Sequence, residues 1–440
     1  MTGTAPRPAS KDVASIMGAA PPVQGEGNPD RGKRENMNSD QTTLARSKAS
    51  QAFKMPEGVG KFVLVFQGGG ALGAYQAGVY QALHEANLEP DWVIGTSIGA
   101  INASLIAGNE PARRVERLHA FWSQVEHSPA FDLVSAWKPL LASVLPNLAT
   151  VTSGVAGFFR PNPLAFVGQQ VRLAPEAAGY YSTLPLKRTL EELVDFSRIG
   201  KDGPRLTVGA ANVATAQMRY FDSSQDKLDA RHILASGALP PAFPAVRIDG
   251  ELFWDGGILS NTPVEAVFDD YPRRSSLILA VHVWNPDGPE PDSIQQVLNR
   301  QKDLQYSSRA ATHIKKQAQL HRLRHIISEM TALLPEEQRQ KPEVREMAAY
   351  GCLTKMHVVR LLAPRLEGED QTKDIDFSRA GIRSRWESGY LDAQQVLKQQ
   401  PWQVDVDPRE GFYLHDLQRD TADPASMADH GDISRLNPAE

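Results

Sequence analysis

Short apolar runs alternate with longer helical patterns through the middle of this 440-residue chain. The runs at 62–66, 92–94 and 277–283 have the length and the β-branched content of buried strands. Runs at 206–211 and 219–221 indicate further strands, and we expect 277–283 to be the last strand of the sheet. Buried strands that alternate with helices predict an α/β fold with a mainly parallel central sheet.

The second half of the chain predicts a mainly helical extension. A charged helical pattern runs over about 292–334, and such a run usually marks the solvated face of a helix, with a membrane-surface or oligomer helix as the alternative. A strand at 356–362 and a helix at 378–398 follow. The composition divides the chain into a disordered leader (1–56), a domain that carries the motifs below (57–285), the helical extension (286–400) and an acidic, mobile tail (401–440).

A serine at a sharp turn is the strongest candidate for a nucleophile. The second apolar run ends in Gly95-Thr96-Ser97-Ile98-Gly99, and a small, apolar helix pattern follows. A serine held between a strand and a helix sits in strained backbone geometry, so small residues on either side are needed to let the two elements pass closely. The helix N-terminus also places positive dipole charge beside Ser97, which favours an oxyanion there. An ordinary Gly/Ser turn is the alternative interpretation.

A glycine-rich loop containing Gly68, Gly69, Gly70 and Gly73 follows the first apolar run. Acyl transfer needs backbone N–H donors aimed at the developing oxyanion, and glycine lets the main chain approach closely. The same spacing matches the dinucleotide-binding fingerprint, which requires an acidic residue at the end of the second strand. Because Asp91 precedes that strand and the serine turn occupies its end, we favour the oxyanion loop.

A nucleophilic serine also needs a base. A histidine oriented by a carboxylate is the usual partner, and the chain has 11 histidines. Those downstream of the serine, such as His232 and His282, lie within helix or strand patterns and stand in no recognisable loop context. We therefore interpret the histidines as core or surface residues.

A downstream aspartate is the better-placed candidate for the base. Asp255 ends a short strand pattern and is followed by Gly256 and Gly257. An Asp-Gly hairpin turn is the alternative interpretation. The next segment, Asn261–Glu265, contains a Thr-Pro pair typical of a helix start, which indicates that Asp255 is held on a strand-loop-helix scaffold.

These motifs, in this order, resemble those of patatin-like acyl hydrolases, which include bacterial patatin-like phospholipases. The resemblance rests on the glycine loop, the serine turn and the Asp-Gly-Gly turn with Asn261 and Pro263 behind it. A Pro- and Phe-containing segment, Ala235–Val246, adds to it, and the match covers roughly 62–283. The resemblance implies a three-layer α/β/α fold with a mainly parallel sheet, followed here by the helical extension.

The resemblance also implies a Ser-Asp dyad that cleaves lipid esters without a cofactor or a metal. Ser97 would attack the ester carbonyl, Asp255 would take its proton, and an acyl-serine intermediate would be hydrolysed by water. An aspartate is a weak base, with an ordinary pKa of about 3.9, so it needs close contact with the hydroxyl and a partly desolvated site. The residues implied as oxyanion donors are Gly68, Gly69 and Gly70, and those implied as supports of the motifs are Gly73, Gly95, Gly99, Gly256 and Gly257.

The chain departs from the family at Leu72, where members often carry Arg or Lys. This difference leaves the headgroup preference for a phospholipid open. Two other functions remain as alternatives: an esterase with a Ser-His-Asp triad, and a non-catalytic protein that binds lipid or acts as a scaffold.

Composition narrows the cellular context. The formal net charge of −5 argues against nucleic acid as a partner. The single cysteine, Cys352, excludes an intramolecular disulfide and fits a reducing compartment, so we predict a cytoplasmic protein that can also contact a membrane or lipid surface. No run approaches the roughly 18 apolar residues of a membrane span, and no Cys/His spacing indicates a zinc site.

One apolar segment between the serine and the aspartate has two interpretations. Residues 131–181 carry apolar positions at partial helical spacing, interrupted by prolines. A set of short helices packed on the core is the favoured interpretation. The alternative is an apolar lid that admits acyl chains.

Overall fold

The computed structural model describes residues 53–126 and 154–417, apart from 167, 169, 367–368, 405–406 and 408–409. Most of the predicted leader (1–56), the first part of the 131–181 segment and the end of the predicted tail (401–440) lie outside the described residues. The domain boundaries that we drew from the sequence stay predictions.

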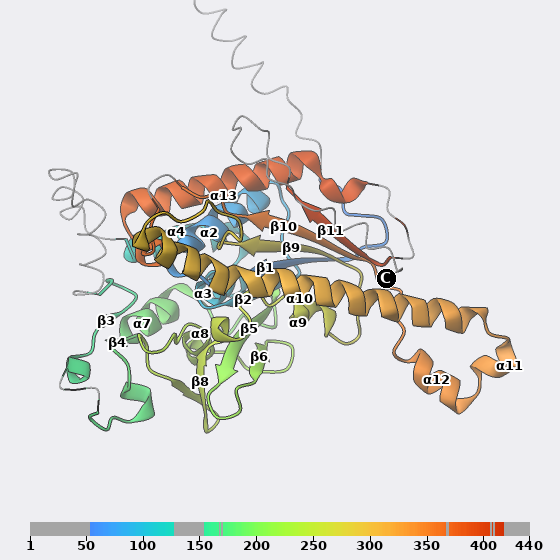
Figure 1. The fold of residues 1–440 in the computed structure, drawn as a ribbon, viewed down its shortest axis with the longest axis horizontal. Coiled ribbons are helices and arrows are strands. Elements are labelled where there is room, and N and C mark those ends of the chain that lie inside the picture. Colours follow the sequence, from blue (N-terminus) through green and yellow to red (C-terminus); the bar gives the residue numbers. More distant parts are fainter. Residues whose placement is uncertain are drawn as a thin grey trace, which may run out of the picture. The chain divides into compact units, whose positions relative to one another are not determined.

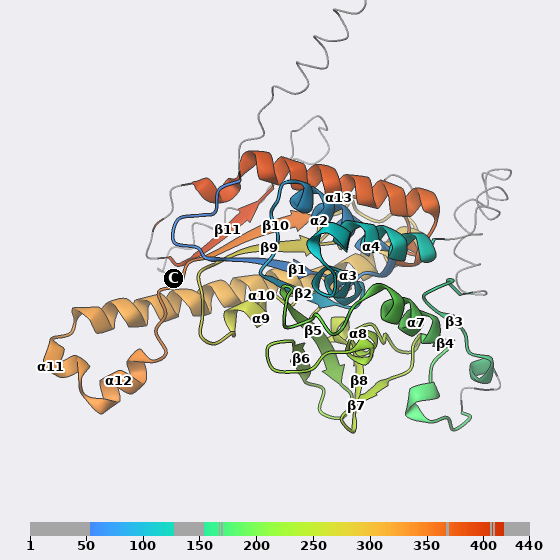
Figure 2. The same cartoon turned by 180° about the vertical axis from the view of Figure 1, so that it is seen from behind.

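Nine of the described strands form one sheet, in the order β11-β10-β9-β1-β2-β5-β8-β7, with β6 paired to β5 (Figures 1 and 2). The six strands from β11 to β5 are parallel to one another, whereas β6, β7 and β8 are antiparallel to their neighbours. The strands of this sheet are β1 (Lys61–Phe66), β2 (Trp92–Thr96), β5 (Arg205–Asn212), β6 (Met218–Asp222), β7 (Val246–Ile248), β8 (Glu251–Asp255), β9 (Ser276–His282), β10 (Met356–Leu362) and β11 (Phe412–Asp416).

Helices cover both faces of the sheet, and two short strands, β3 (Arg160–Pro161) and β4 (Tyr181–Ser182), pair separately. The mainly parallel α/β fold predicted from the strand and helix patterns is confirmed. The helices are α2 (Ala74–Glu85), α3 (Ile98–Ala107), α4 (Pro111–Gln124), α7 (Leu184–Leu193), α8 (Ala230–Ser236), α9 (Glu265–Phe268), α10 (Ile294–Leu333), α11 (Glu336–Arg339), α12 (Pro342–Ala348) and α13 (Arg379–Gln399).

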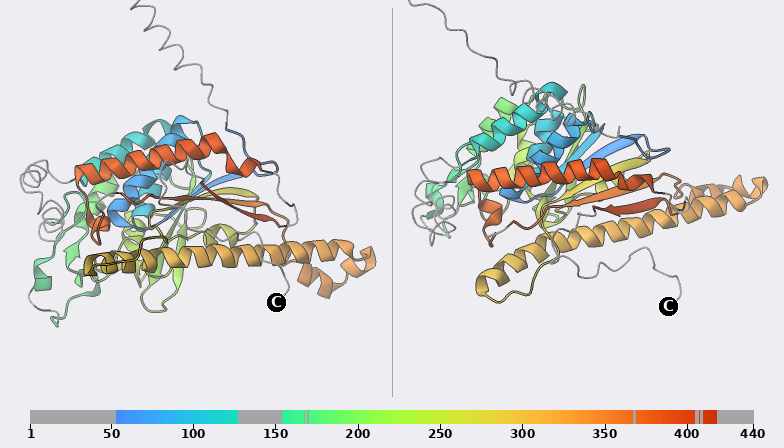
Figure 3. Two further views of the ribbon diagram at one scale, coloured as in Figure 1. Left: turned by 45° about the horizontal axis from the view of Figure 1, so that its top comes forward. Right: turned by 90° about the horizontal axis from the view of Figure 1, so that it is seen from above.

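The alternation of side chains along β1 creates two apolar cores. Leu64 and Phe66 belong to the larger core, which also takes in apolar residues of α2, α3, α4 and α13. Val63 and Val65 point to the other face and pack with α9 residues and with Ile314 of α10. Figure 3 shows α13 and α10 on opposite faces of the sheet, so the architecture has three layers, helix, sheet and helix.

The prediction that 277–283 closes the sheet is wrong. This run forms β9, which lies inside the sheet, because β10 and β11 pair beyond it in parallel register. The burial of both faces of β10 fits an interior strand, since Met356, Val358 and Val359 are all buried. The sheet therefore continues across the boundary that we predicted at residue 285.

Helices α2 and α13 approach each other closely at two glycines. A Cβ at Gly78 would overlap the Trp386 carbonyl group, and a Cβ at Gly389 would overlap the carbonyl oxygen of Tyr75. The obstacle is backbone in both cases, so no side-chain rotation can relieve it. The contact fastens the C-terminal helix directly to the helix that follows the glycine loop.

We predict that Gly389→Val lowers the free energy of unfolding by about 2–3 kcal/mol, because the two helix backbones must separate to admit the new side chain. Urea unfolding at constant m-value measures the change. Gly60→Val is the control, because a Cβ at Gly60 meets no atom within 4 Å. Equal stability of the two variants would contradict the proposed backbone contact.

Candidate active site

Ser97 lies at the turn between β2 and α3. Its backbone has φ 56° and ψ −123°, a region that residues with a side chain rarely adopt and that concentrates at functional sites. The Ser97 amide donates a hydrogen bond of 3.0 Å to the hydroxyl of Ser236, which itself donates to the Gly209 carbonyl at 2.6 Å. These contacts hold the strained turn against β5 and α8.

The glycines around Ser97 allow strand and helix to pass within contact distance. A Cβ at Gly99 would lie 2.5 Å from the carbonyl oxygen of Phe66, and a Cβ at Gly95 would overlap the backbone of Gly99. A Cβ at Gly73 would lie 2.5 Å from the side chain of Ile98. The sequence spacing thus has the steric reason expected for a sharp serine turn.

The register of the sheet brings Ser97 and Asp255 together although 158 positions separate them in the sequence. Thr96, the last residue of β2, lies opposite Gly209 of β5, and Asp255, the last residue of β8, lies opposite the next β5 residue, Ala210. Both strand ends therefore reach the same level of the sheet. Ser97 and Asp255 therefore line the same pocket, and the Ser97 hydroxyl lies close enough to the Asp255 carboxylate to favour its charged form.

The Asp255 carboxylate is almost completely buried, with 3% of the residue exposed. Burial raises its pKa from an ordinary value near 3.8 to about 6, because the charged form loses its hydration. The nearby Ser97 hydroxyl and the Gly257 amide, which donates a hydrogen bond of 2.7 Å, favour the charged form and partly offset this rise in pKa. The carboxylate is thus a stronger proton acceptor than an exposed aspartate.

The glycine loop lies beside Ser97, but its three amides are not equivalent. The Gly68 amide donates to the Asn261 carbonyl at 3.1 Å, and the Gly68 carbonyl accepts from the Asn261 side-chain amide at 3.0 Å. Within the described part of the chain, we find no acceptor for the amides of Gly69 and Gly70. Of the three donors predicted from the sequence, Gly68 is therefore already occupied.

A pocket of about 970 Å³, including its open mouth, extends from Ser97, Asp255 and the glycine loop. Apart from the catalytic candidates, it is mainly apolar, as a site for an acyl chain should be. Its apolar and aromatic lining residues are Ile98, Ile101, Phe158, Phe159, Tyr181, Leu239, Ala242, Phe243, Trp284, Tyr306, Ile375 and Phe377.

The described part of the 131–181 segment contributes to this pocket. Phe158 and Phe159 follow the undescribed stretch, and Tyr181 forms part of β4. These aromatic rings contact one another and Phe243, with centroid distances of 5.0–6.3 Å. This placement favours the acyl-binding interpretation for residues 154–181, whereas the earlier residues of the segment lie outside the described structure.

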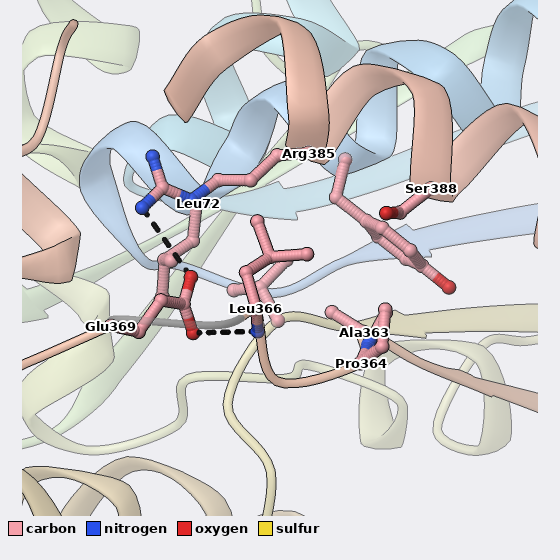
Figure 4. Close-up of a pocket in the computed structure, with 9 residues that line it drawn as sticks. Leu72, Ala363, Pro364, Leu366, Glu369, Arg385 and Ser388 are labelled. Carbon is pink, nitrogen blue, oxygen red and sulfur yellow. Dashed lines mark hydrogen bonds and ion pairs between the residues drawn. The ribbon is translucent and has the colours of Figure 1, made fainter. Parts of the chain in front are cut away.

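Leu72 does not line the pocket that contains Ser97. It faces a separate, smaller pocket of about 270 Å³, together with Ala363, Leu366, Glu369 and Arg385 (Figure 4). The departure from the family pattern therefore lies outside the larger pocket, and Arg385 of α13 lines the smaller pocket beside Leu72.

Hydrogen bonds from buried polar side chains support the site, and the sequence did not lead us to predict them. The Gln67 side chain accepts hydrogen bonds from the backbone amides of Val283 and Trp284. Asn102 of α3 donates to the Gly73 carbonyl at 2.9 Å. The Trp284 indole donates to the Gly68 carbonyl at 2.8 Å. A polar residue inside an apolar pattern was the available signal, since Gln67 and Asn102 each interrupt a buried run.

Among the described residues, no histidine lines the pocket. His232 lies on α8, where its ring takes part in a capping box with Asp229. His282 ends β9 and is buried, which lowers the pKa of its ring to about 3. In the same part of the chain we find no cluster of potential metal ligands, and no helix with the length and apolarity of a membrane span.

Two family models match the chain. Residues 64–268 match the model described as patatin-like phospholipase, and residues 304–409 match a second model described as patatin phospholipase. The chain belongs to the patatin-like phospholipase family, a family of ester-bond hydrolases.

Similar proteins carry the same family name. Patatin-like phospholipase domain-containing protein 6 of Mus musculus is 27% identical over 255 residues, which are 58% of this chain and 15% of that protein. Patatin-like phospholipase domain-containing protein 7 of Rattus norvegicus is 25% identical over 224 residues, 51% of this chain and 14% of that protein. The chain thus spans about 15% of the length of the curated relatives it matches.

Among solved structures, VipD from Legionella pneumophila is similar to this chain with a TM-score of 0.34 and 14% sequence identity. The similarity covers 81% of this chain and 72% of that one.

Because the Asp255 carboxylate is buried, we predict that replacing it with a neutral side chain stabilises the protein. Between the unfolded pKa near 3.8 and the folded pKa of about 6, the unfolded chain ionises first, so the stability of the wild type falls as pH rises through this window. Asp255→Asn keeps an acceptor for the Gly257 amide and avoids this cost. We expect the variant to be more stable at pH 7.5 by up to about 3 kcal/mol, from roughly two pKa units at 1.36 kcal/mol each.

Urea unfolding of both proteins across this pH range measures the difference in stability. The gain should shrink toward zero below pH 3.8, where the aspartate is protonated in both states. Asp249→Asn, at an exposed position of the neighbouring hairpin, is the control and should show no such pH dependence. A stability difference that is constant with pH would contradict the raised pKa.

Proposed function

We propose that the protein is a serine acyl hydrolase that cleaves carboxylic esters of lipids through a Ser97-Asp255 dyad. The observation that carries this proposal is that Ser97, on a strained turn, and the buried Asp255 carboxylate line one mainly apolar pocket, with the Ser97 hydroxyl close enough to lower the pKa of the acid. The family supports a lipid substrate, because its members are described as phospholipases.

The first half of the reaction follows from this geometry. The Ser97 oxygen attacks the ester carbonyl carbon while its proton passes to the Asp255 carboxylate. The carbonyl oxygen becomes an oxyanion, which the free amides of Gly69 and Gly70 and the N-terminus of α3 stabilise. The intermediate then collapses, the leaving alcohol takes the proton from Asp255, and the acyl group remains on Ser97.

Water completes the cycle. It attacks the acyl-Ser97 carbonyl while Asp255 accepts its proton, and the second intermediate releases the fatty acid as the proton returns to the Ser97 oxygen. Asp255 thus acts as base and then as acid in each half-reaction. A pKa of about 6 suits both roles better than that of an exposed aspartate, because it lies closer to neutral pH.

We also propose that the protein meets its substrate at a lipid surface. The apolar pocket lining leaves little to recognise in a water-soluble substrate, whereas a long acyl chain gains free energy on entering it. The predicted cytoplasmic location stays part of this proposal. Because no histidine among the described residues lines the pocket, the pocket favours the dyad over a Ser-His-Asp triad.

We predict that Ser97→Ala and Asp255→Asn each lower kcat/KM for lipid and p-nitrophenyl esters by on the order of 10³-fold or more, since either change removes an essential step. A fluorophosphonate probe should label wild-type protein at Ser97 alone. Ser104→Ala is a matched control, because the Ser104 hydroxyl donates to the Ile101 carbonyl within α3 and does not line the pocket.

Two results would contradict the dyad. If Asp255→Asn retained a near-normal rate while a histidine variant lost it, a Ser-His-Asp mechanism would replace the proposal. Folded wild-type protein that neither reacts with the probe nor hydrolyses any ester would support a lipid-binding protein.

We further predict that kcat/KM rises about tenfold per pH unit below pH 6 and levels off above it, because Asp255 must be ionised to accept a proton. The steady-state rate on a p-nitrophenyl ester, measured between pH 4.5 and 8, tests this. A midpoint near 4, the value of an exposed aspartate, would be incompatible with the buried base.

A further inference from the structure

One wall of the catalytic pocket comes from far along the chain. Asp374, Ile375 and Phe377 line the pocket and belong to residues 369–377, which we call the wall loop. The wall loop lies beyond residues 64–268, the part of the chain that carries the serine turn, the glycine loop and the aspartate. The C-terminal extension therefore completes the pocket.

The wall loop touches both ends of the pocket. At the catalytic end, the Asp374 carbonyl oxygen packs against Gly70, where a Cβ would overlap it. At the apolar end, the buried ring of Phe377 contacts Phe158 with a centroid distance of 5.7 Å. Ile375 lies between the two and is half-buried. An acyl chain bound in this pocket can therefore contact the loop at Ile375 and Phe377.

Ion pairs with α10 fix the wall loop from one side. Asp303 of α10 is only 1% exposed and receives the Lys373 ammonium group at 2.6 Å and the Arg365 guanidinium group at 3.1 Å. Lys373 itself is 5% exposed. Lys302 pairs with Asp374 at 2.7 Å. A buried pair of this kind fixes geometry, because breaking it leaves an uncompensated charge.

Helix α13 holds the loop from the other side. Arg385 donates to the Asp376 carbonyl at 3.0 Å and pairs with the carboxylates of Asp376 and Glu369. Figure 4 shows the Glu369 carboxylate between Arg385 and the Leu366 amide. Because α13 is fastened to α2 at Gly389, the loop is linked to the helix that follows the glycine loop.

We propose that the wall loop sets the acyl-chain selectivity of the enzyme, with Ile375 and Phe377 as specificity-determining residues and the Asp303-Lys373 pair as positioning residues. The proposal rests on the proposed ester hydrolase function. The ligand class is a fatty acyl chain, since the lining is mainly apolar and no cation among the described residues lines the pocket to bind an anionic group. Each methylene that enters the apolar pocket adds to binding, so the length of the pocket decides which chains bind well.

The test compares p-nitrophenyl butyrate with p-nitrophenyl dodecanoate in wild-type protein and in Ile375→Trp. The larger ring fills the pocket next to Phe377, so we expect the dodecanoate-to-butyrate ratio of kcat/KM to fall at least tenfold. Leu391→Trp is the matched control, because Leu391 lies on α13, is 55% exposed and does not line the pocket. A ratio for Ile375→Trp within twofold of the wild type would overturn the proposal.

Covalent labelling separates this proposal from the proposed function. The rate at which Ser97 reacts with a butyl and a dodecyl fluorophosphonate reports chain selectivity without turnover. If wild-type protein reacts with neither probe and cleaves neither ester, the hydrolase function fails. If wild-type protein reacts and the chain-length ratio is the same in Ile375→Trp, only the role of the wall loop fails.

Lys373→Met tests the positioning pair. Loss of the ammonium group leaves Asp303 buried with Arg365 as its remaining partner, so the wall loop should shift and the dodecanoate-to-butyrate ratio should fall at least threefold. A merely structural role would lower the rates on both esters by the same factor and leave the ratio unchanged, which would contradict the assignment. Lys187→Met controls for the loss of one charge, because Lys187 lies on α7, its side chain is 43% exposed, and it pairs with Glu191 on the same helix.

Discussion

Ser97 and Asp255 lie beside each other because β2 and β8 both pair with β5 and end at the same level. A change of one residue in either register would turn one of these side chains to the opposite face of the sheet. The rest of the structure holds the ends of β2 and β8 at this level. The buried runs of β1, β2 and β5 fix the register, and the close contacts at Gly95 and Gly99 fix the turn.

At Asp255, the burial that makes the carboxylate a better base also lowers the stability of the fold. The Asp255 carboxylate accepts a hydrogen bond from the Gly257 amide and lies near the Ser97 hydroxyl, but no cation among the described residues pairs with it. Burial outweighs both contacts in setting its pKa. A paired cation would stabilise the charged form and hold the pKa low, which would make the carboxylate a poorer base. The fold therefore carries an energetic cost at this position, and the cost is what moves the pKa toward neutral pH.

The sequence predicted the elements that depend on local patterns. The strand at 356–362 has the bounds of β10, the helix expected after the serine turn is α3, and α10 and α13 lie within a few residues of the predicted helices. The position of β10 was missed, since strand order depends on pairing partners that no local pattern encodes. The hydrogen bond from the Gly68 amide to the Asn261 carbonyl could not be predicted either, because no local pattern encodes this distant partner. The wall loop was missed because its sequence, mostly acidic and polar around Ile375 and Phe377, has no apolar periodicity.

The wall loop also explains why the C-terminal extension belongs to the same unit as the motifs. A strand added to the edge of a sheet can be supported by local pairing, but β10 and β11 carry α13 and the wall loop back to the glycine loop. The charges on the loop are matched by α10 on one side and by α13 on the other. A polar loop can line an apolar pocket only if its charges are paired outside the pocket, because a free charge facing an acyl chain would have to be desolvated without compensation. The ion pairs of Asp303 and Arg385 meet this requirement and leave Ile375 and Phe377 to face the substrate.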